Sequence, residues 1–156
     1  MKLIQDTKEF FKRPFFSDER TLWGLWMLLP LIAALLKIHK HNNYLIFRGV
    51  FWHTWDKVSL YTEYPQEYFD TNHYGPFFSL VIAPFALMPE WVGLLFWLIA
   101  LSLSLFLATR GLPIDYRKKV FIYWFCAHEL LTALFMSQFN IAIAAIIIAT
   151  FYCIEK

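Results

Sequence analysis

The chain has 156 residues, of which 59% are hydrophobic, 21% aromatic and 17% charged. Soluble domains carry about 45–50% apolar and about 25% charged residues, so this composition excludes a water-soluble globular domain. The formal net charge of +2 is too small to indicate a nucleic-acid partner. Cys126 and Cys153 both lie in apolar runs, which supports neither a disulfide framework nor a Cys-based metal site. We therefore expect an integral membrane protein.

The first uncharged run covers residues 21–36. A membrane-spanning helix needs about 20 mostly apolar residues, and the flanking Arg20 and Lys37 can extend this run to the two interfaces. The polar residues before it place the apolar segment too far along the chain for a cleavable signal peptide. The pattern predicts a cytoplasmic tail over 1–20 and a first transmembrane helix over 21–39.

Four more apolar segments follow a polar loop. The first two are separated by Glu90 alone, which indicates a tight helical hairpin. The run from 120 to 154 would rise roughly 52 Å as one helix, far beyond a hydrocarbon core of about 30 Å. A polar patch at 137–140 is the natural break in that run. The second to fifth transmembrane helices are expected at 75–89, 91–109, 118–136 and 139–154. The predicted fold class is therefore all-α, a polytopic bundle of about five membrane helices.

The distribution of basic residues gives an orientation. The tail is rich in them, with Lys2, Lys8, Lys12, Arg13 and Arg20. The positive-inside rule then places the tail in the cytoplasm and the 40–74 loop outside. Five crossings would also place the basic loop at 110–119 outside, which conflicts with that rule. A re-entrant segment at 71–89 would remove the conflict, but the full crossing is the prediction retained.

The 40–74 loop begins with an aromatic stripe at roughly helical spacing, formed by Tyr44, Phe47, Phe51 and Trp55. This pattern predicts an amphipathic interfacial helix that lies along the membrane surface. Asn42 or Asn43 is well placed to cap its N-terminus.

The same loop contains four acids and three histidines, namely Asp56, Glu63, Glu67, Asp70, His41, His53 and His73. One interpretation is an aromatic belt with solvated acids. The other is an active site at the membrane surface, where a carboxylate deprotonates an acceptor hydroxyl. The histidines lack the i, i+4 spacing of a helical metal pair, so no metal site is predicted.

Four further polar residues fall within the later apolar segments. His128 and Glu129 are ionisable, and such groups inside a membrane face protein or water by default and mark functional candidates. The alternative for this pair is a position near the interface. Gln138 and Asn140 are better explained as hydrogen-bonding contacts between helices than as substrate contacts.

Three blocks of residues, in this order, resemble a known family. The first is Asn43-Tyr44-Leu45-Ile46-Phe47 continuing to Ser59-Leu60-Tyr61. The second is His73-Tyr74-Gly75-Pro76-Phe77-Phe78-Ser79-Leu80, followed by Ala83-Pro84-Phe85-Ala86 and Met88-Pro89. The third is Glu129-Leu130, Ala133-Leu134 and Gln138-Phe139-Asn140, similar to a Gly-Gln-x-Asn motif with Ser137 in the Gly position. Together they resemble glycosyltransferase family 87, polyprenol-phosphate-mannose-dependent mannosyltransferase-like proteins of the GT-C class.

The resemblance implies a membrane hexosyltransferase, with mannose as the first candidate sugar. Its donor would be a polyprenyl-phosphate sugar and its acceptor a glycan or glycolipid at the outer face of the bacterial cytoplasmic membrane. Membrane lipids would be partners, no cofactor is implied, and the 40–74 loop would hold the catalytic acid. Members of the family have more helices, so the chain looks like their N-terminal portion, truncated after 156 and inactive by itself.

One departure from the family concerns the acid. Asn43 stands at the family's acidic position, and an amide cannot act as a general base. Asp70 is the first replacement and Asp56 the second. Arg48 and Lys57 are candidate contacts for the donor phosphate. The remaining candidate substrate contacts are Tyr61, Tyr74, His128, Glu129, Gln138 and Asn140.

A second hypothesis is a non-catalytic polytopic membrane protein, such as a transporter subunit or an assembly partner. In it, the polar residues at 128–129 and 138–140 would line a polar path or join helices. The sequence beyond Lys156 discriminates between the two, because further helices would support the enzyme and a stop codon would support the small protein. Whether the chain is an enzyme stays open at this point.

Overall fold

The structure is a computed structural model that describes residues 13–37 and 39–154. Every regular element in these ranges is helical, which confirms the all-α class for the described chain. Most of the expected tail, with Lys2, Lys8 and Lys12, lies outside the described residues. The elements are η1 (Pro14–Phe16), α2 (Glu19–Lys37), α3 (Asn42–Trp55), α4 (Phe78–Ala86), α5 (Glu90–Gly111), α6 (Tyr116–Phe135) and α7 (Asn140–Ile154).

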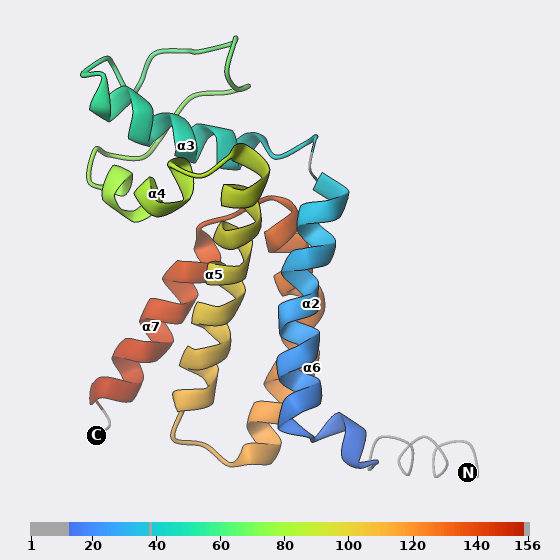
Figure 1. Cartoon of the computed structure of the whole chain (residues 1–156). Coiled ribbons are helices and arrows are strands. Elements are labelled where there is room, and N and C mark those ends of the chain that lie inside the picture. The colour runs from blue at the N-terminus through green and yellow to red at the C-terminus, as the bar shows by residue number, and fades with distance from the viewer. Residues whose placement is uncertain (1–12, 38, 155–156) are drawn as a thin grey trace.

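Four long helices form an elongated bundle with a cap at one end. Helices α2, α5, α6 and α7 run along the bundle, and α3, α4 and the loop between them cover its upper end in Figure 1. Helix α5 contacts α2, α6 and α7, while α3 packs against α4. The α6–α7 turn lies at the capped end, and the α5–α6 connection lies at the opposite end together with the start of α2.

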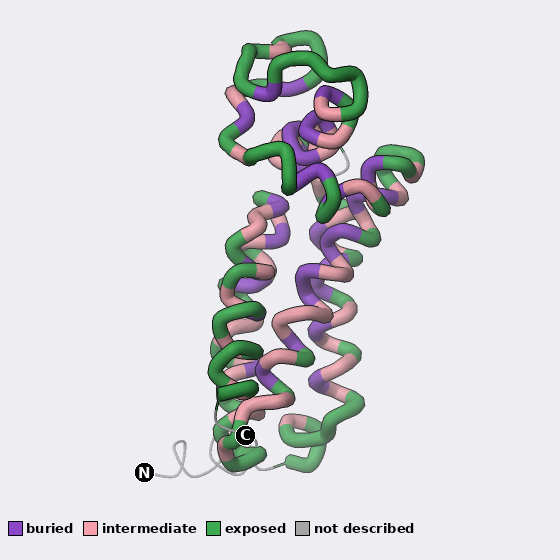
Figure 2. Tube along the Cα trace, turned by 90° about the vertical axis from the view of Figure 1, so that its left-hand side faces the viewer, coloured by how far each residue is buried: buried purple, intermediate pink, exposed green. Residues whose placement is uncertain are grey.

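Two helices are long and apolar enough to cross a membrane. They are α2, with 19 residues, and α5, with 22. Helix α7 is apolar but has only 15 residues. Helix α6 has 20 residues, but its sequence includes the basic residues 117–119 and the pair at 128–129. Many of the exposed side chains of the bundle are large and apolar. Figure 2 shows how buried and exposed positions alternate along the helices.

Helix α4 differs from the expectation of a full crossing over 75–89. It has nine residues and rises about 14 Å, less than half of a hydrocarbon core of about 30 Å. It contacts α3 and α5 at the capped end of the bundle. The segment therefore has no helix long enough to cross, and the chain leaves α4 at the same end at which it entered.

This turn-back decides where the basic 110–119 loop lies. Arg110 forms an ion pair with Glu19 at the start of α2, with 2.9 Å between Nη2 and Oε1. The Tyr116 hydroxyl donates to the Ser17 carbonyl oxygen, and Trp124 Nε1 donates to the Phe16 carbonyl oxygen at 2.8 Å. The basic loop and the N-terminal residues thus lie at one end of the bundle. Five crossings would have placed these two segments at opposite ends.

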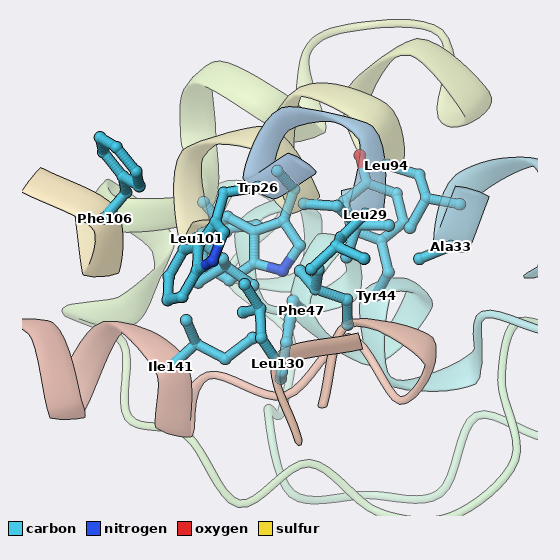
Figure 3. Close-up of a cluster of buried hydrophobic side chains, with 14 of the residues drawn as sticks. Trp26, Leu29, Ala33, Tyr44, Phe47, Leu94, Leu101, Phe106, Leu130 and Ile141 are labelled. Atoms are coloured by element: carbon cyan, nitrogen blue, oxygen red, sulfur yellow. The ribbon is translucent and has the colours of Figure 1, made fainter. Parts of the chain in front are cut away.

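The core of the bundle is apolar and aromatic, and the close-up in Figure 3 shows part of it. Trp26 of α2 is completely buried, and its indole N–H donates to the Tyr123 carbonyl oxygen of α6 at 3.1 Å. Ser102 of α5 donates to the Trp26 carbonyl oxygen at 2.6 Å. Since an unpaired polar group is costly in an apolar interior, these two bonds fix the relative positions of α2, α5 and α6.

Helix α3 occupies the place predicted for the interfacial helix. Its N-cap residue is His41, which makes no side-chain capping bond, so the prediction of an Asn42 or Asn43 cap is wrong. Tyr44 and Phe47 of the aromatic stripe are buried against the bundle. Both asparagines lie in the first turn of α3 and use their amides for contacts with distant segments.

A glycine sets the contact between the cap and the bundle. Gly93 of α5 faces the Tyr44 hydroxyl and the Phe85 carbonyl oxygen, and a β-carbon there would overlap both atoms. The Tyr44 hydroxyl donates to that carbonyl at 3.0 Å. Because Gly93 has no side chain, α3, α4 and α5 can meet at one point.

Replacing Gly93 with alanine is therefore expected to destabilise the protein by about 2–3 kcal/mol, through overpacking and loss of the Tyr44 hydrogen bond. The matched control is Gly24→Ala in α2, where a β-carbon would meet nothing within 4 Å. That control should stabilise by about 0.5–1 kcal/mol because alanine is the better helix former. Thermal unfolding in nanodiscs followed by circular dichroism measures both, and equal effects would contradict the predicted contact.

Candidate functional site

A pocket of about 240 Å³ lies at the capped end of the bundle. Its walls come from α3, from the end of the loop that follows α3, and from the α6–α7 turn. The lining residues are Asn43, Ile46, Phe47, Asp70, Thr71, His73, Tyr74, Gln138, Phe139 and Asn140. All three sequence blocks, and the acid named as the first replacement base, thus contribute to a single cavity.

Asn43 ties two walls of this pocket together. Its amide Nδ2 donates to the Met136 carbonyl oxygen at 2.7 Å, which joins the first turn of α3 to the end of α6. The Asn43 side chain therefore serves as a hydrogen-bond donor to a carbonyl. A carboxylate could not make this bond, because it has no proton to donate when ionised.

Asp70 stands at the rim of the pocket with an unusual backbone. Its φ is 83°, a region that non-glycine residues rarely adopt. Its Oδ1 accepts a hydrogen bond from the Thr71 N–H at 2.7 Å, and the side chain is otherwise exposed. Backbone strain of this kind costs about 1–3 kcal/mol and persists only where the surroundings impose it.

Two asparagine amides impose the conformation around Asp70. The Asn42 amide accepts from the Phe69 N–H at 2.7 Å and donates to the Phe69 carbonyl oxygen, so it holds both backbone groups of that residue. The Asn72 amide accepts from the Tyr74 N–H at 2.8 Å and donates to the Leu60 and Tyr74 carbonyl oxygens. Asp70 is thus fixed from both sides along the chain.

The α6–α7 turn presents Gln138 and Asn140 to the pocket. Ser137 has a φ of 49°, its N–H donates to the Leu134 carbonyl oxygen at 2.9 Å, and the Gln138 N–H donates to the Ala133 carbonyl oxygen at 3.0 Å. This pair of bonds is the Schellman arrangement, in which the left-handed residue is most often glycine. The Gly of the Gly-Gln-x-Asn motif that the third block resembles would suit the left-handed conformation that Ser137 adopts here.

An aromatic cluster forms the floor between the pocket and the bundle. Phe139 stacks on Trp97 of α5, with ring centroids 6.0 Å apart and an interplanar angle of 11°. Its ring also contacts Phe78 edge-on at 5.1 Å and Tyr74 at 6.3 Å. Phe139 was not selected from the sequence, although its place inside the third block was the available signal.

Several of the predicted site residues do not line this pocket. Arg48 turns toward α5, with 3.3 Å between its Nη1 and Glu90 Oε2, and its Nε donates to the Ala86 carbonyl oxygen. His41 contacts the other oxygen of Glu90 at 2.8 Å. Asp56 follows α3 directly and is exposed. Lys57 and Tyr61 are exposed as well.

His128 and Glu129 lie apart from the pocket on α6. Their side chains are 83% and 80% exposed, and the two residues are 3.5 Å apart from Nδ1 to Oε1. Gln138 and Asn140, in contrast, line the pocket. The structure therefore brings Asp70, Tyr74, Gln138 and Asn140 together and leaves the pair at 128–129 outside.

A second polar cluster lies behind α3, and the pairing of its residues was not predicted from the sequence. The buried His53 contacts Glu67 at 3.1 Å between Nε2 and Oε2, and its ring lies 3.8 Å from that of Tyr64. Tyr68 is also buried here, and its hydroxyl has no hydrogen-bond partner within the described ranges. Among the described residues no three His, Cys, Asp or Glu gather as a metal site.

Comparison with known proteins assigns the family. The model of glycosyltransferase family 87 matches residues 72–156, more than half of the chain, and the chain belongs to this family. The match covers the second and third sequence blocks. Searches of the curated proteins and of the solved structures give no match. Family membership together with the long apolar helices makes this a membrane protein of the glycosyltransferase class.

The left-handed backbone at Ser137 gives a testable prediction about stability. Ser137→Gly should stabilise the protein by roughly 0.5–1 kcal/mol, because glycine adopts this φ without steric cost. Ser104→Gly makes the same chemical change at a right-handed position inside α5 and should destabilise by about 1 kcal/mol. Chemical unfolding of the two variants in the same nanodiscs gives the comparison, and a loss of stability in both would refute the strain at Ser137.

The raised pKa of Tyr68 gives a second testable prediction, about the pH dependence of stability. Burial, followed by the nearby Glu67 carboxylate and Tyr64, raises the pKa of Tyr68 from 10.0 to about 12. The folded protein therefore holds this proton more tightly than the unfolded chain does. The resulting stability is complete below pH 10 and is lost as the pH rises toward 12.

Tyr68→Phe should consequently remove one late-titrating tyrosine from the ultraviolet absorbance titration of the folded protein. In the parent protein, the free energy of unfolding falls between pH 10 and pH 12 as the Tyr68 hydroxyl loses its proton. Tyr68→Phe should make that fall smaller by about 2–3 kcal/mol, the free energy that corresponds to the full rise of the Tyr68 pKa. Tyr61→Phe is the control, because the Tyr61 side chain is exposed. A variant at Tyr68 that leaves the late phase unchanged would contradict the assignment.

Proposed function

We propose that this chain carries the outer-face active site of a membrane hexosyltransferase. The sugar, with mannose as the first candidate, would pass from a polyprenyl-phosphate donor to a glycan or glycolipid acceptor. Membership of glycosyltransferase family 87 supports the transfer of a sugar. The observation that carries the proposal is the pocket in which Asp70 meets the 138–140 block.

The proposed topology has four crossings, made by α2, α5, α6 and α7, in the bacterial cytoplasmic membrane. The N-terminus would be cytoplasmic, and the cap with its pocket would face outward. Support comes from the basic residues Arg20, Arg110 and 117–119, which belong to the end of the bundle opposite the cap. The positive-inside rule favours the cytoplasmic side for that end.

The proposed reaction is a displacement at the anomeric carbon of the donor sugar. An acceptor hydroxyl oxygen forms the new bond to that carbon, the bond from the carbon to the phosphate oxygen breaks, and polyprenyl phosphate leaves with the electron pair. Asp70 takes the proton of the attacking hydroxyl. Tyr74, Gln138 and Asn140 would hold the sugar by hydrogen bonds, since their side chains line the same pocket.

The donor phosphate needs cations near the cap. Arg48 and Lys57, which the sequence analysis named for this role, remain the proposed contacts. Arg48 already contacts Glu90, so a phosphate would compete with that carboxylate. Tyr61, His128 and Glu129 remain proposed substrate contacts from the sequence, without a place in this pocket.

Asp70→Asn should lower kcat by roughly 10²–10⁴-fold, the usual contribution of a general base, because the amide cannot accept the proton. The assay follows transfer of labelled mannose from polyprenyl-phosphate mannose in membrane vesicles, with the protein expressed as its gene encodes it. Asp56→Asn is the matched control and should retain turnover, because Asp56 does not line the pocket. Undiminished turnover in Asp70→Asn would refute Asp70 as the base, and loss of turnover in Asp56→Asn alone would move that role to Asp56.

A further inference from the structure

A second pocket, of about 350 Å³, lies in the loop between α3 and α4. It is lined by Glu63, Tyr64, Pro65, Tyr68, Phe69, Asp70 and Thr71. Two of these residues, Asp70 and Thr71, also line the 240 Å³ pocket described above. Asp70, the residue with the unusual φ, thus lies in the wall of both cavities.

The lining of the 350 Å³ pocket has a distinct chemistry. It combines aromatic rings and a proline with the carboxylates of Glu63 and Asp70, and it contains no lysine, arginine or histidine. Two carboxylates without a cation disfavour a phosphate or another anion. Rings beside hydrogen-bond acceptors suit a pyranose, whose C–H face packs on an aromatic ring and whose hydroxyls donate to carboxylates.

Phe69 is the most informative residue of this lining. Its side chain is 85% exposed, so its ring adds little to the folded core. Its backbone is nonetheless held at both polar groups by the Asn42 amide. A large apolar ring that stays exposed on a held backbone is available to a ligand at a defined place in the loop, because the ordering of the main chain there does not have to be paid on binding.

The two cavities differ in their position relative to the bundle. The 240 Å³ pocket includes the α6–α7 turn and therefore lies at the top of the membrane helices, where a lipid-linked sugar can enter. Residues 63–71 belong to the loop on the far side of α3 in Figure 1. An acceptor could thus approach Asp70 from the side opposite the donor.

We infer that the 350 Å³ pocket binds a pyranose ring of the acceptor and directs its hydroxyl to Asp70. This inference rests on the proposed function for its role in transfer, while the binding of a sugar can be measured without any reaction. Phe69 supplies the stacking surface, and Glu63 accepts hydrogen bonds from ring hydroxyls. Phe69 and Glu63 are then determinants of acceptor specificity.

The first experiment measures binding by saturation-transfer NMR with methyl α-D-mannopyranoside and methyl β-D-glucopyranoside as probes. The protein is held in phospholipid nanodiscs, because glycoside detergents would compete for the pocket. Phe69→Ala should weaken binding of at least one probe by roughly threefold to tenfold, as expected for loss of a stacking contact. Glu63→Gln should weaken it as well, because the amide is a poorer acceptor than the carboxylate.

The matched control is Phe77→Ala. Phe77 is 84% exposed and does not line the pocket. Its replacement by alanine removes the same number of atoms as Phe69→Ala does. It should leave binding unchanged, and all three variants should keep the melting temperature of the parent protein. Equal binding by the Phe69 and Phe77 variants, or no binding of either probe by the parent protein, would overturn the inference.

A second experiment separates this inference from the proposed function. In the transfer assay, Phe69→Ala should raise the KM for the acceptor and leave the KM for the donor unchanged. Asp70→Asn should lose turnover and weaken binding of the probe glycosides no more than Glu63→Gln does, because an amide oxygen still accepts a hydrogen bond. If Asp70→Asn stays active while Phe69→Ala weakens glycoside binding, the base assignment fails and the sugar site stands. If Asp70→Asn is inactive and Phe69→Ala binds the glycosides normally, the sugar site fails and the base assignment stands.

Discussion

The length of α4 is the constraint on which the candidate site depends. Nine residues cannot cross a hydrocarbon core, so the chain turns back beneath α3 and α5 begins at the capped end. The number of passes that the chain makes along the bundle before α6 sets the end at which the α6–α7 turn emerges. One more pass would place Gln138 at the opposite end from Asp70, and the pocket could not form. The same turn-back brings the basic 110–119 loop to the N-terminal end.

Backbone-directed amides then give the cap its shape. Asn42 and Asn72 hold the loop on either side of Asp70, and Asn43 joins α3 to the end of α6. Asn42 and Asn72 each donate to a backbone carbonyl and accept from a backbone N–H, and Asn43 donates to a carbonyl. Such bonds stabilise a segment that has no regular secondary structure. This network is the physical reason why Asp70 can hold an unfavourable φ. Asn43 has a definite structural role in it, as the link between α3 and α6.

Asp70 lies between two cavities, and in the proposed reaction one cavity would hold the donor and the other the acceptor. One cavity adjoins the bundle and has amide and hydroxyl groups in its walls, and the other lies in the loop with rings and carboxylates. A transfer reaction needs its two substrates to be held side by side in a reactive geometry. The chain belongs to a family of glycosyltransferases, and two adjoining pockets of different chemistry are consistent with a donor and an acceptor.

The sequence by itself determined the all-α class, four of the long apolar segments, the helix after residue 41 and the family, because these depend on local composition and on residue order. It also selected Asp70, Tyr74, Gln138 and Asn140 before any contact between them was known. Only the tertiary structure decided that α4 turns back, that Asn42 and Asn43 tether distant segments rather than cap α3, and that Arg48 faces Glu90. These features depend on contacts between residues far apart in the chain, which neither hydropathy nor spacing encodes.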